Sequence, residues 1–94
     1  MHPLIEVHRD ALRALALHYG IRSIKVFGSM ARDDGDETSD VDLLVETSPD
    51  TSGFALGALL MDAQDLLGRR VDIVTHNALH PAMRARVLRE ARTL

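Results

Sequence analysis

The sequence predicts a small α/β domain in which helices pack on a sheet of at least three strands. Apolar residues recur at helical spacing in three long segments, three short segments rich in β-forming residues lie between them, and Gly, Pro or a polar loop marks most boundaries. The 94 residues contain no repeat and no linker long enough to divide domains, so we expect residues 1–94 to form one domain.

The chain is predicted to begin with a helix over residues 3–19. Pro3 stands in its first turn and Gly20 directly follows it, which are the positions that these two residue types favour at the start and end of a helix. The alternating segment 22–27 predicts a strand, and a short helical turn is expected at 30–33.

The rest of the chain continues the alternation of strands and helices. Turn-forming polar residues predict loops, runs of β-forming residues predict strands, and longer apolar periodicities predict helices. In order, the predicted elements are a polar loop at 33–39, a strand at 41–46, a helix at 54–67, a strand at 69–75 and a helix at 81–92.

The predicted helix at 54–67 is apolar around much of its circumference. One explanation is burial between the sheet and another helix. The other is an exposed apolar face that binds a protein partner. The sequence leaves both explanations open.

The composition excludes several classes of function. A net charge of −3 gives no overall basic surface for a nucleic-acid backbone, so we expect no direct nucleic-acid partner. The absence of cysteine excludes disulfides, thiolate catalysis and cysteine zinc sites. Because there is neither a signal-peptide pattern nor a run of about 20 apolar residues, we expect a cytoplasmic protein that does not associate with membranes.

The first candidate site feature is the pair Gly28-Ser29, between a predicted strand and a predicted helical turn. Glycine lets the backbone approach a ligand closely, and the N–H groups that follow, with the serine hydroxyl, would hold phosphate oxygens at the start of a helix. The alternative is an ordinary turn in which Ser29 caps the helix. Taken alone, the pair favours the ordinary turn, because Gly-Ser is common in turns and Ser is a common helix cap.

Three aspartates form the second feature. Asp40 and Asp42 stand two residues apart at the start of a predicted strand, so their side chains would point to the same face, about 6.5–7 Å apart along it. Asp72 lies between apolar residues of the next predicted strand, where propensity disfavours an aspartate. The alternative is that each carboxylate simply faces water, and for an isolated Asp-x-Asp motif this alternative is favoured.

A shared site would explain these residues together. Three carboxylates on adjacent strands suit Mg²⁺ or Mn²⁺, because both ions prefer hard oxygen ligands. With a phosphate-holding turn beside them, they supply the parts required for a two-metal displacement at phosphorus. The set therefore predicts this chemistry more strongly than any one of its pieces.

These motifs resemble those of the DNA polymerase β-like nucleotidyltransferase superfamily. The superfamily pattern is Gly-Ser with an Arg shortly after, then Asp-x-Asp in an apolar strand, then a third acid on a later strand. Here it stands as GSMAR at 28–32, SDVDLLV at 39–45 and VDIV at 71–74. The resemblance covers nearly the whole chain, which is most similar in pattern to the minimal nucleotidyltransferase (MNT) antitoxins of HEPN/MNT toxin–antitoxin systems.

The resemblance implies a fold, an activity and a partner. The fold would be the nucleotidyltransferase fold, a small mixed sheet of at least three strands with helices packed on it. The activity would be that of a protein adenylyltransferase, an enzyme that transfers AMP from ATP to a tyrosine of a HEPN-family toxin ribonuclease and so neutralises it. A hetero-oligomer with that toxin is expected.

The resemblance also assigns roles to the site residues. Asp40 and Asp42 would bind both metal ions, two Mg²⁺ or Mn²⁺. Asp72 would complete one of the metal sites and help to deprotonate the incoming hydroxyl. Gly28 and Ser29 would hold the triphosphate of ATP.

Two further residues of the motif region carry expectations. Arg32 would brace the turn against the acidic loop that follows, and the resemblance also allows it a contact with phosphate in the nucleotide site. Asp33 departs from the pattern, because relatives often carry Gly at this position. The departure bears on the geometry of the turn and on nucleotide affinity.

Three other functions are compatible with parts of the same pattern. A non-catalytic antitoxin with the same fold would neutralise its toxin by binding and covering it. Nucleotidylation of a small molecule usually requires an additional domain for the acceptor. Template-dependent polymerisation is disfavoured, because the chain offers no basic groove.

Overall fold

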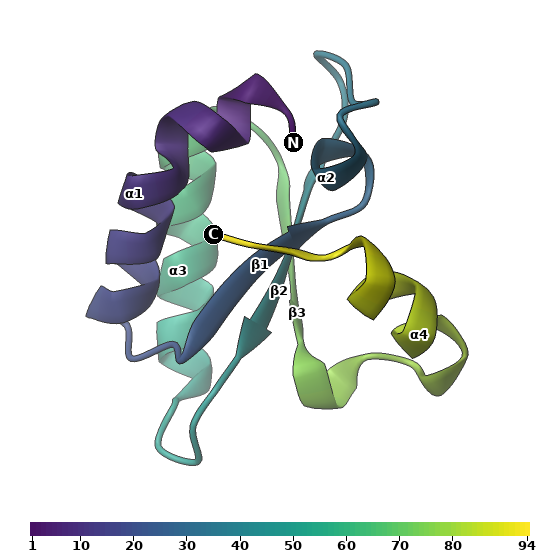
Figure 1. Ribbon diagram of the computed structural model, residues 1–94. Helices are drawn as coiled ribbons and strands as arrows, with labels where there is room; N and C mark the ends of the chain where they lie inside the picture. The colour runs from purple at the N-terminus through teal and green to yellow at the C-terminus, as the bar shows by residue number, and fades with distance from the viewer.

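The computed structural model describes residues 1–94, in which helices and strands alternate along the chain (Figure 1). The elements are α1 (Pro3–His18), β1 (Ser23–Phe27), α2 (Ser29–Arg32), β2 (Val41–Glu46), α3 (Gly53–Leu67), β3 (Val71–Thr75), the 3₁₀ helix η1 (His76–Ala78), α4 (Pro81–Glu90) and β4 (Arg92–Thr93). Every element predicted from the sequence is present, and its bounds differ by at most two residues at either end.

The sheet has four strands in the order β3-β2-β1-β4. β1 pairs antiparallel with both β2 and β4, whereas β2 pairs parallel with β3. A parallel pair requires a crossover connection, and α3 supplies it between β2 and β3. The predicted mixed sheet with helices packed on it is therefore confirmed, with one strand more than the sequence indicated.

The fourth strand corrects the prediction of a helix over 81–92. The helix α4 ends at Glu90, and β4 follows it after one residue. Lys25 pairs with Thr93, and the amide of Leu94 donates to the carbonyl of Ile24 at 3.2 Å. A two-residue strand is too short to leave an alternating pattern in the sequence, so only pairing with β1 reveals it.

Local signals explain where the two long helices begin and end. Nδ1 of His2 accepts from the amide of Leu4 at 3.0 Å and so caps α1. The hydroxyl of Ser52 accepts from the amide of Ala55 at 3.1 Å and caps α3. Gly68 ends α3 with a φ of 63°, a left-handed conformation that favours glycine.

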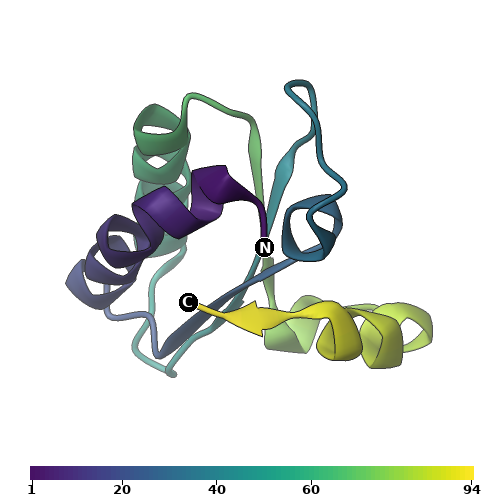
Figure 2. The same ribbon diagram turned by 45° about the horizontal axis from the view of Figure 1, so that its top comes forward.

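The main core lies between α1, α3 and one face of the sheet (Figure 1, Figure 2). Alternate residues of each strand point into it, and those of β2 are completely buried. Its principal members are Ile5, Leu12, Ile24, Val26, Val41, Leu43, Val45, Leu59 and Ala63.

Burial explains part of the apolar circumference of α3, and binding of a partner by its outer side stays a prediction. Leu59, Ala63 and Leu67 are buried against the sheet and α1. Phe54 and Met61 are 90% and 58% exposed on its outer side. Burial accounts for the inner stripe, and the outer residues stay in contact with solvent.

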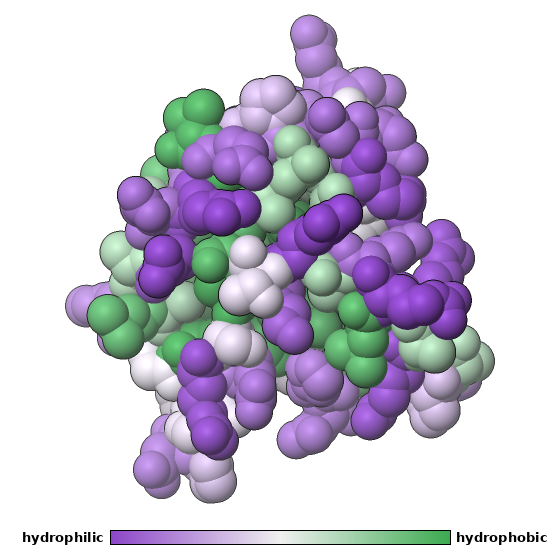
Figure 3. Space-filling view, in the orientation of Figure 1, coloured by the Kyte–Doolittle hydropathy of each residue, from purple (hydrophilic) through white to green (hydrophobic).

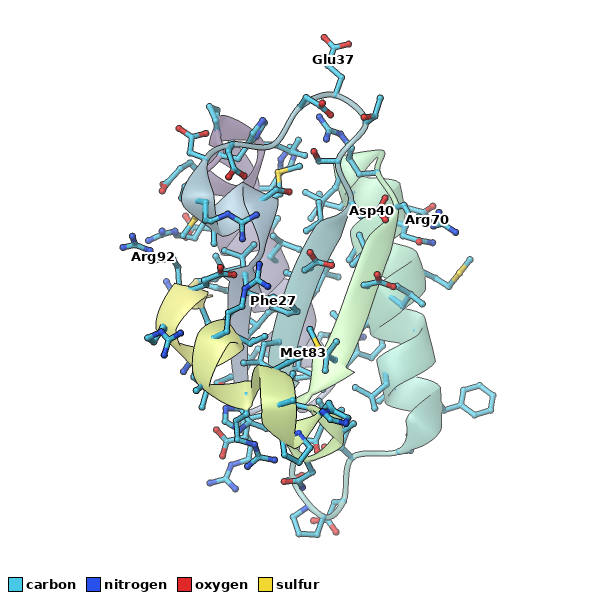
Figure 4. The ribbon with its side chains drawn as sticks, turned by 90° about the vertical axis from the view of Figure 1, so that its right-hand side faces the viewer. Phe27, Glu37, Asp40, Arg70, Met83 and Arg92 are labelled. Atoms are coloured by element: carbon cyan, nitrogen blue, oxygen red, sulfur yellow. The ribbon has the colours of Figure 1, made fainter.

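The opposite face of the sheet is covered only in part. A small second cluster joins Leu44 of β2 to Leu79 and Val87, the one buried residue of α4. Figure 4 shows α4 across one end of this face, with the other end open. The surface seen in Figure 3 is mainly hydrophilic with separate apolar areas, and no helix is both long enough and apolar enough to cross a membrane.

Candidate active site

The strand register places two of the predicted site aspartates side by side. Phe27 of β1 pairs with Asp42 of β2, and Asp42 pairs with Asp72 of β3. Directly paired residues point to the same face of a sheet, so these three side chains lie side by side across three strands. Asp42 and Asp72 are called the aspartate row below. Asp40 comes just before β2, and Figure 4 shows it at the same open end of the sheet.

The row is electrostatically unfavourable without a cation. Burial raises the pKa of Asp42 above its ordinary value, and the negative charges of Asp72 and Asp40 raise it further. The guanidinium of Arg32 acts in the opposite direction and offsets only part of this effect. The arrangement therefore favours a bound positive charge at this end of the sheet.

Gly28 brings the turn between β1 and α2 against this row. Its backbone has φ 72° and ψ −152°, a region that is essentially restricted to glycine. A Cβ added here would lie 2.5 Å from Oδ2 of Asp42. Two independent constraints thus require glycine, and the second is contact with the aspartate row itself.

Ser29 does not serve as the cap of the short helix that follows. It lies inside α2 as its first residue, and the start of α2 has no side-chain capping bond. The amides of Ala31 and Arg32 both donate to the carbonyl of Gly28 at 3.1 Å, so the N–H groups at the open start of this helix are those of Ser29 and Met30. The alternative that Ser29 is only a helix cap is therefore not what the structure shows, and its hydroxyl is available to a ligand.

Arg32 links α2 to two acidic side chains. Its Nε donates to Oδ2 of Asp34 at 3.0 Å, and its Nη1 donates to Oε1 of Glu90 at 3.1 Å. Glu90 also pairs with Arg86, at 3.5 Å. Arg32 thus braces the acidic loop and α4 together, while its contact with nucleotide stays a prediction. Glu90 was not foreseen, because nothing in the sequence joins two residues so far apart.

Asp33, the departure from the superfamily pattern, ends α2 in the left-handed conformation, with φ 60° and ψ 32°. This geometry explains why glycine suits the position. Aspartate is one of the few other residues that adopt it at modest cost. The substitution therefore leaves the turn intact.

The acidic loop is ordered by its own side chains and by one arginine. The carboxylate of Asp36 accepts from the amide of Thr38 at 2.8 Å, and its hydrogen bonds to Thr38 are the main reason that its pKa is lowered. Nη1 of Arg69 donates to the carbonyls of Asp36 and Ser39, at 2.8 and 3.1 Å. These contacts fix the chain just before it enters Asp40.

The donor set fits Mg²⁺ or Mn²⁺ bound together with substrate. No group of three or more histidine or acidic side chains that could hold a metal ion is present, so Asp40, Asp42 and Asp72 do not form such a group. Mg²⁺ does not require such a cage, because it usually binds one or two carboxylates together with water and substrate phosphates. The half-buried Asp42 and its like-charged neighbours supply that kind of partial ligand set.

Asp72 is exposed to solvent, whereas Asp40 and Asp42 are partly buried. Three hollows on the molecule include none of these aspartates in their walls.

Comparison with known proteins identifies the family. The model of the nucleotidyltransferase domain family matches residues 5–94. The chain is 37% identical over 87 residues to protein adenylyltransferase MntA of Thermococcus cleftensis, which covers 93% of this chain and 85% of the relative.

Two solved structures show the same fold. The first, a provisionally assigned minimal nucleotidyltransferase, is 38% identical with a TM-score of 0.88, and the match covers 100% of this chain and 97% of that one. The second contains an MNT antitoxin with the tri-AMPylated HEPN toxin of Shewanella oneidensis; it is 17% identical with a TM-score of 0.71, covering 94% of this chain and 69% of that one. The chain therefore belongs to the nucleotidyltransferase domain family, and its fold is that of a minimal nucleotidyltransferase.

Proposed function

We propose that residues 1–94 act as a single-domain antitoxin that transfers AMP from ATP to a tyrosine of a HEPN-family toxin and thereby neutralises it. The observation that carries the proposal is the contact between the Gly28 turn and the row of Asp42 and Asp72. This contact puts the turn that would hold phosphate next to paired carboxylates. The adenylyltransferase relative and the AMPylated toxin seen with an MNT antitoxin support the choice of reaction.

The reaction is a displacement at the α-phosphorus of ATP. The tyrosine oxygen forms a new bond to this phosphorus, while the bond to the oxygen that bridges the α- and β-phosphates breaks. Pyrophosphate leaves with the electron pair of the broken bond. Asp72 accepts the proton of the tyrosine hydroxyl, since it is the exposed member of the row.

Each motif residue has a role in positioning. Asp40, Asp42 and Asp72 would hold two Mg²⁺ or Mn²⁺ ions. When bound, such ions neutralise the charge of the triphosphate and of the pyrophosphate that leaves. The N–H groups after Gly28 and the hydroxyl of Ser29 hold the triphosphate tail.

Arg32 supplies positive charge beside Asp42 and stabilises the turn through Asp34. Phosphate oxygens of ATP would compete with Asp34 and Glu90 for its guanidinium, because all three are anionic acceptors. A contact between Arg32 and the nucleotide therefore requires one of these two ion pairs to open.

Neutralisation by covering alone is the competing function. A protein that only covered its partner would gain nothing from a half-buried carboxylate beside like charges, because burial first and the neighbouring charges second raise the pKa of Asp42 and disfavour its ionised form. The row is explained if it binds cations and nucleotide. This argument favours transfer over covering.

The test combines mass spectrometry with two variants. The purified chain is incubated with ATP, Mg²⁺ and a HEPN-family toxin that it binds, and the toxin should gain the mass of one or more AMP units. The double variant Asp40→Asn with Asp42→Asn should lose at least about 100-fold in rate. The matched control Glu37→Gln, an exposed acid at the tip of the acidic loop (Figure 4), should keep the rate of the natural chain.

Two results would count against the proposal. A toxin whose mass does not change with the natural chain rejects adenylyl transfer. A double variant that still blocks the ribonuclease activity as well as the natural chain does, without modifying the toxin, supports neutralisation by covering instead.

A further inference from the structure

On the face that carries the aspartate row, an apolar surface lies next to the aspartates. This surface is formed by Leu44, Val74 and Met83 and is called the apolar ledge. Two residues further along each strand from Asp42 and Asp72, and therefore on the same face, Leu44 pairs with Val74. Leu44 is buried, whereas Val74 is only partly covered by the cluster around α4. Figure 4 shows Met83 of α4 in front of β3 on this face, and its side chain is 50% exposed.

The order of the strands gives the direction from which an acceptor would approach, if the proposed adenylyl transfer holds. The turn at Gly28 touches Asp42 from the side of β1, whereas Asp72 lies beyond Asp42 on β3. In a displacement at phosphorus the attacking oxygen and the leaving group lie on opposite sides. Since the triphosphate lies at Gly28, the acceptor hydroxyl enters from the side of Asp72.

β3 leaves this side accessible. It is the edge strand of the sheet, with β2 on one side and no strand on the other. Asp72 is exposed to solvent there. A side chain from a partner protein can therefore reach Asp72 across the edge without displacing any element of the sheet.

We propose that Val74 and Met83 form the contact surface for the ring of the acceptor side chain. Asp72 and Val74 are two residues apart on β3 and share a face, so they lie about 6.5–7 Å apart along the strand. That spacing suits an aromatic ring lying over Val74 with its hydroxyl at Asp72. The flexible, polarisable side chain of methionine packs well against aromatic rings.

This assignment distinguishes an aromatic acceptor from a small one. A serine or threonine hydroxyl at Asp72 would leave Val74 and Met83 uncovered, whereas a tyrosine ring would remove both from water. The ledge therefore adds selectivity for tyrosine through apolar contact. The principal alternative occupant of this surface is the adenine ring of ATP. Kinetics and methyl NMR distinguish the two occupants.

Steady-state kinetics provide the first test, with the HEPN-family toxin as acceptor. Met83→Ala should raise the KM for the toxin by about five- to ten-fold, as expected for the loss of a few methylene-sized contacts. The KM for ATP should change by less than about two-fold, and Met83→Leu should restore most of the loss. Met61→Ala is the matched control, because Met61 is similarly exposed but lies on α3, on the opposite side of the sheet.

Methyl NMR provides a second test that needs no turnover. With ¹³C-methyl methionine, Mg²⁺ and a non-hydrolysable ATP analogue, saturating toxin should shift the Met83 signal and leave that of Met61 in place. A toxin with its acceptor tyrosine replaced by Phe should still produce the shift, and one with Ala should not. This comparison separates the ring contact from general docking.

The outcomes are distinct for the two proposals. If the natural chain transfers no AMP, the proposed function fails, while the methyl signals still report whether the ring contacts Met83. If Met83→Ala raises only the KM for ATP, or if the ATP analogue alone shifts the Met83 signal, the ledge serves the nucleotide and the inference is wrong. An unchanged Met83 signal with bound toxin also overturns it.

Discussion

The two faces of the sheet contrast most clearly along β2. Val41, Leu43 and Val45 point to one face and are completely buried under α1 and α3. Asp42 and Leu44 alternate with them and point to the other face. Of these two residues of β2, only Leu44 is buried. A single strand thus stabilises the fold on one side and presents a carboxylate on the other, because successive side chains alternate between faces.

The difference between the faces comes from how much each helix covers. α1 and α3 each contribute several buried residues to one face, whereas α4 contributes only Val87 to the other. The ion pair between Glu90 and Arg32 supplements this contact. Incomplete cover leaves Asp72 exposed and Asp42 only half-buried, so the less covered face is the one that carries the proposed site.

The largest expected effect is on stability, from a change on the covered face. Leu43→Ala should lower the free energy of unfolding by about 2–5 kcal/mol, because it leaves a cavity in the main core. Leu44→Ala is the matched change on the other face and should cost less, since its cluster has only three buried members. Urea unfolding followed by circular dichroism measures both. A larger loss for Leu44→Ala would contradict the contrast between the faces.

A change at the turn should affect stability and activity together. Gly28→Ala should cost about 1–3 kcal/mol through its backbone conformation alone, and the new Cβ should push the Asp42 carboxylate out of place. The midpoint temperature of thermal unfolding and the rate of AMP transfer should both fall. The control Gly57→Ala lies in the interior of α3 with nothing within 4 Å of the added Cβ, and it should stabilise the chain by up to about 1 kcal/mol. Full activity in Gly28→Ala would disprove the close contact.

The smallest expected effect is a gain in stability from losing a site residue. The pKa of Asp42 is raised in the folded chain, so its ionisation opposes folding above its ordinary pKa of 3.8. Asp42→Asn should therefore raise stability at pH 7 by about 0.5 kcal/mol or less, since solvent screens a half-exposed group. The gain should shrink as the pH falls through the raised pKa toward 3.8, and it should vanish below 3.8, where Asp42 becomes protonated in the unfolded as well as in the folded state.

Thermal unfolding between pH 4.5 and pH 8 measures this difference. The control Asp50→Asn, in an exposed loop, should show no such trend. Added Mg²⁺ should stabilise the natural chain more than Asp42→Asn, because an ion that binds the folded state stabilises it. A variant less stable than the natural chain at pH 7 without Mg²⁺ would show that the row is not repulsive.

Most local features of the fold could be predicted from the sequence. Pro3 and Gly68 mark a helix start and a helix end, and alternation along 41–46 marks a strand, because these signals act between near neighbours in the chain. The glycine and aspartate motifs also indicated the candidate site residues. Their roles in binding metal and nucleotide remain predictions.

Only the tertiary structure decided how these pieces meet. The parallel register that sets Asp42 beside Asp72 depends on how α3 packs across the sheet, and a shift of one residue would turn Asp72 to the other face. Contact between Gly28 and Asp42, and the pair of Arg32 with Glu90, likewise join segments that no local pattern relates. The sequence by itself determined which residues have the chemistry, since chemistry resides in side chains. Packing between distant segments decided that they share one face, because register is a property of the assembled sheet.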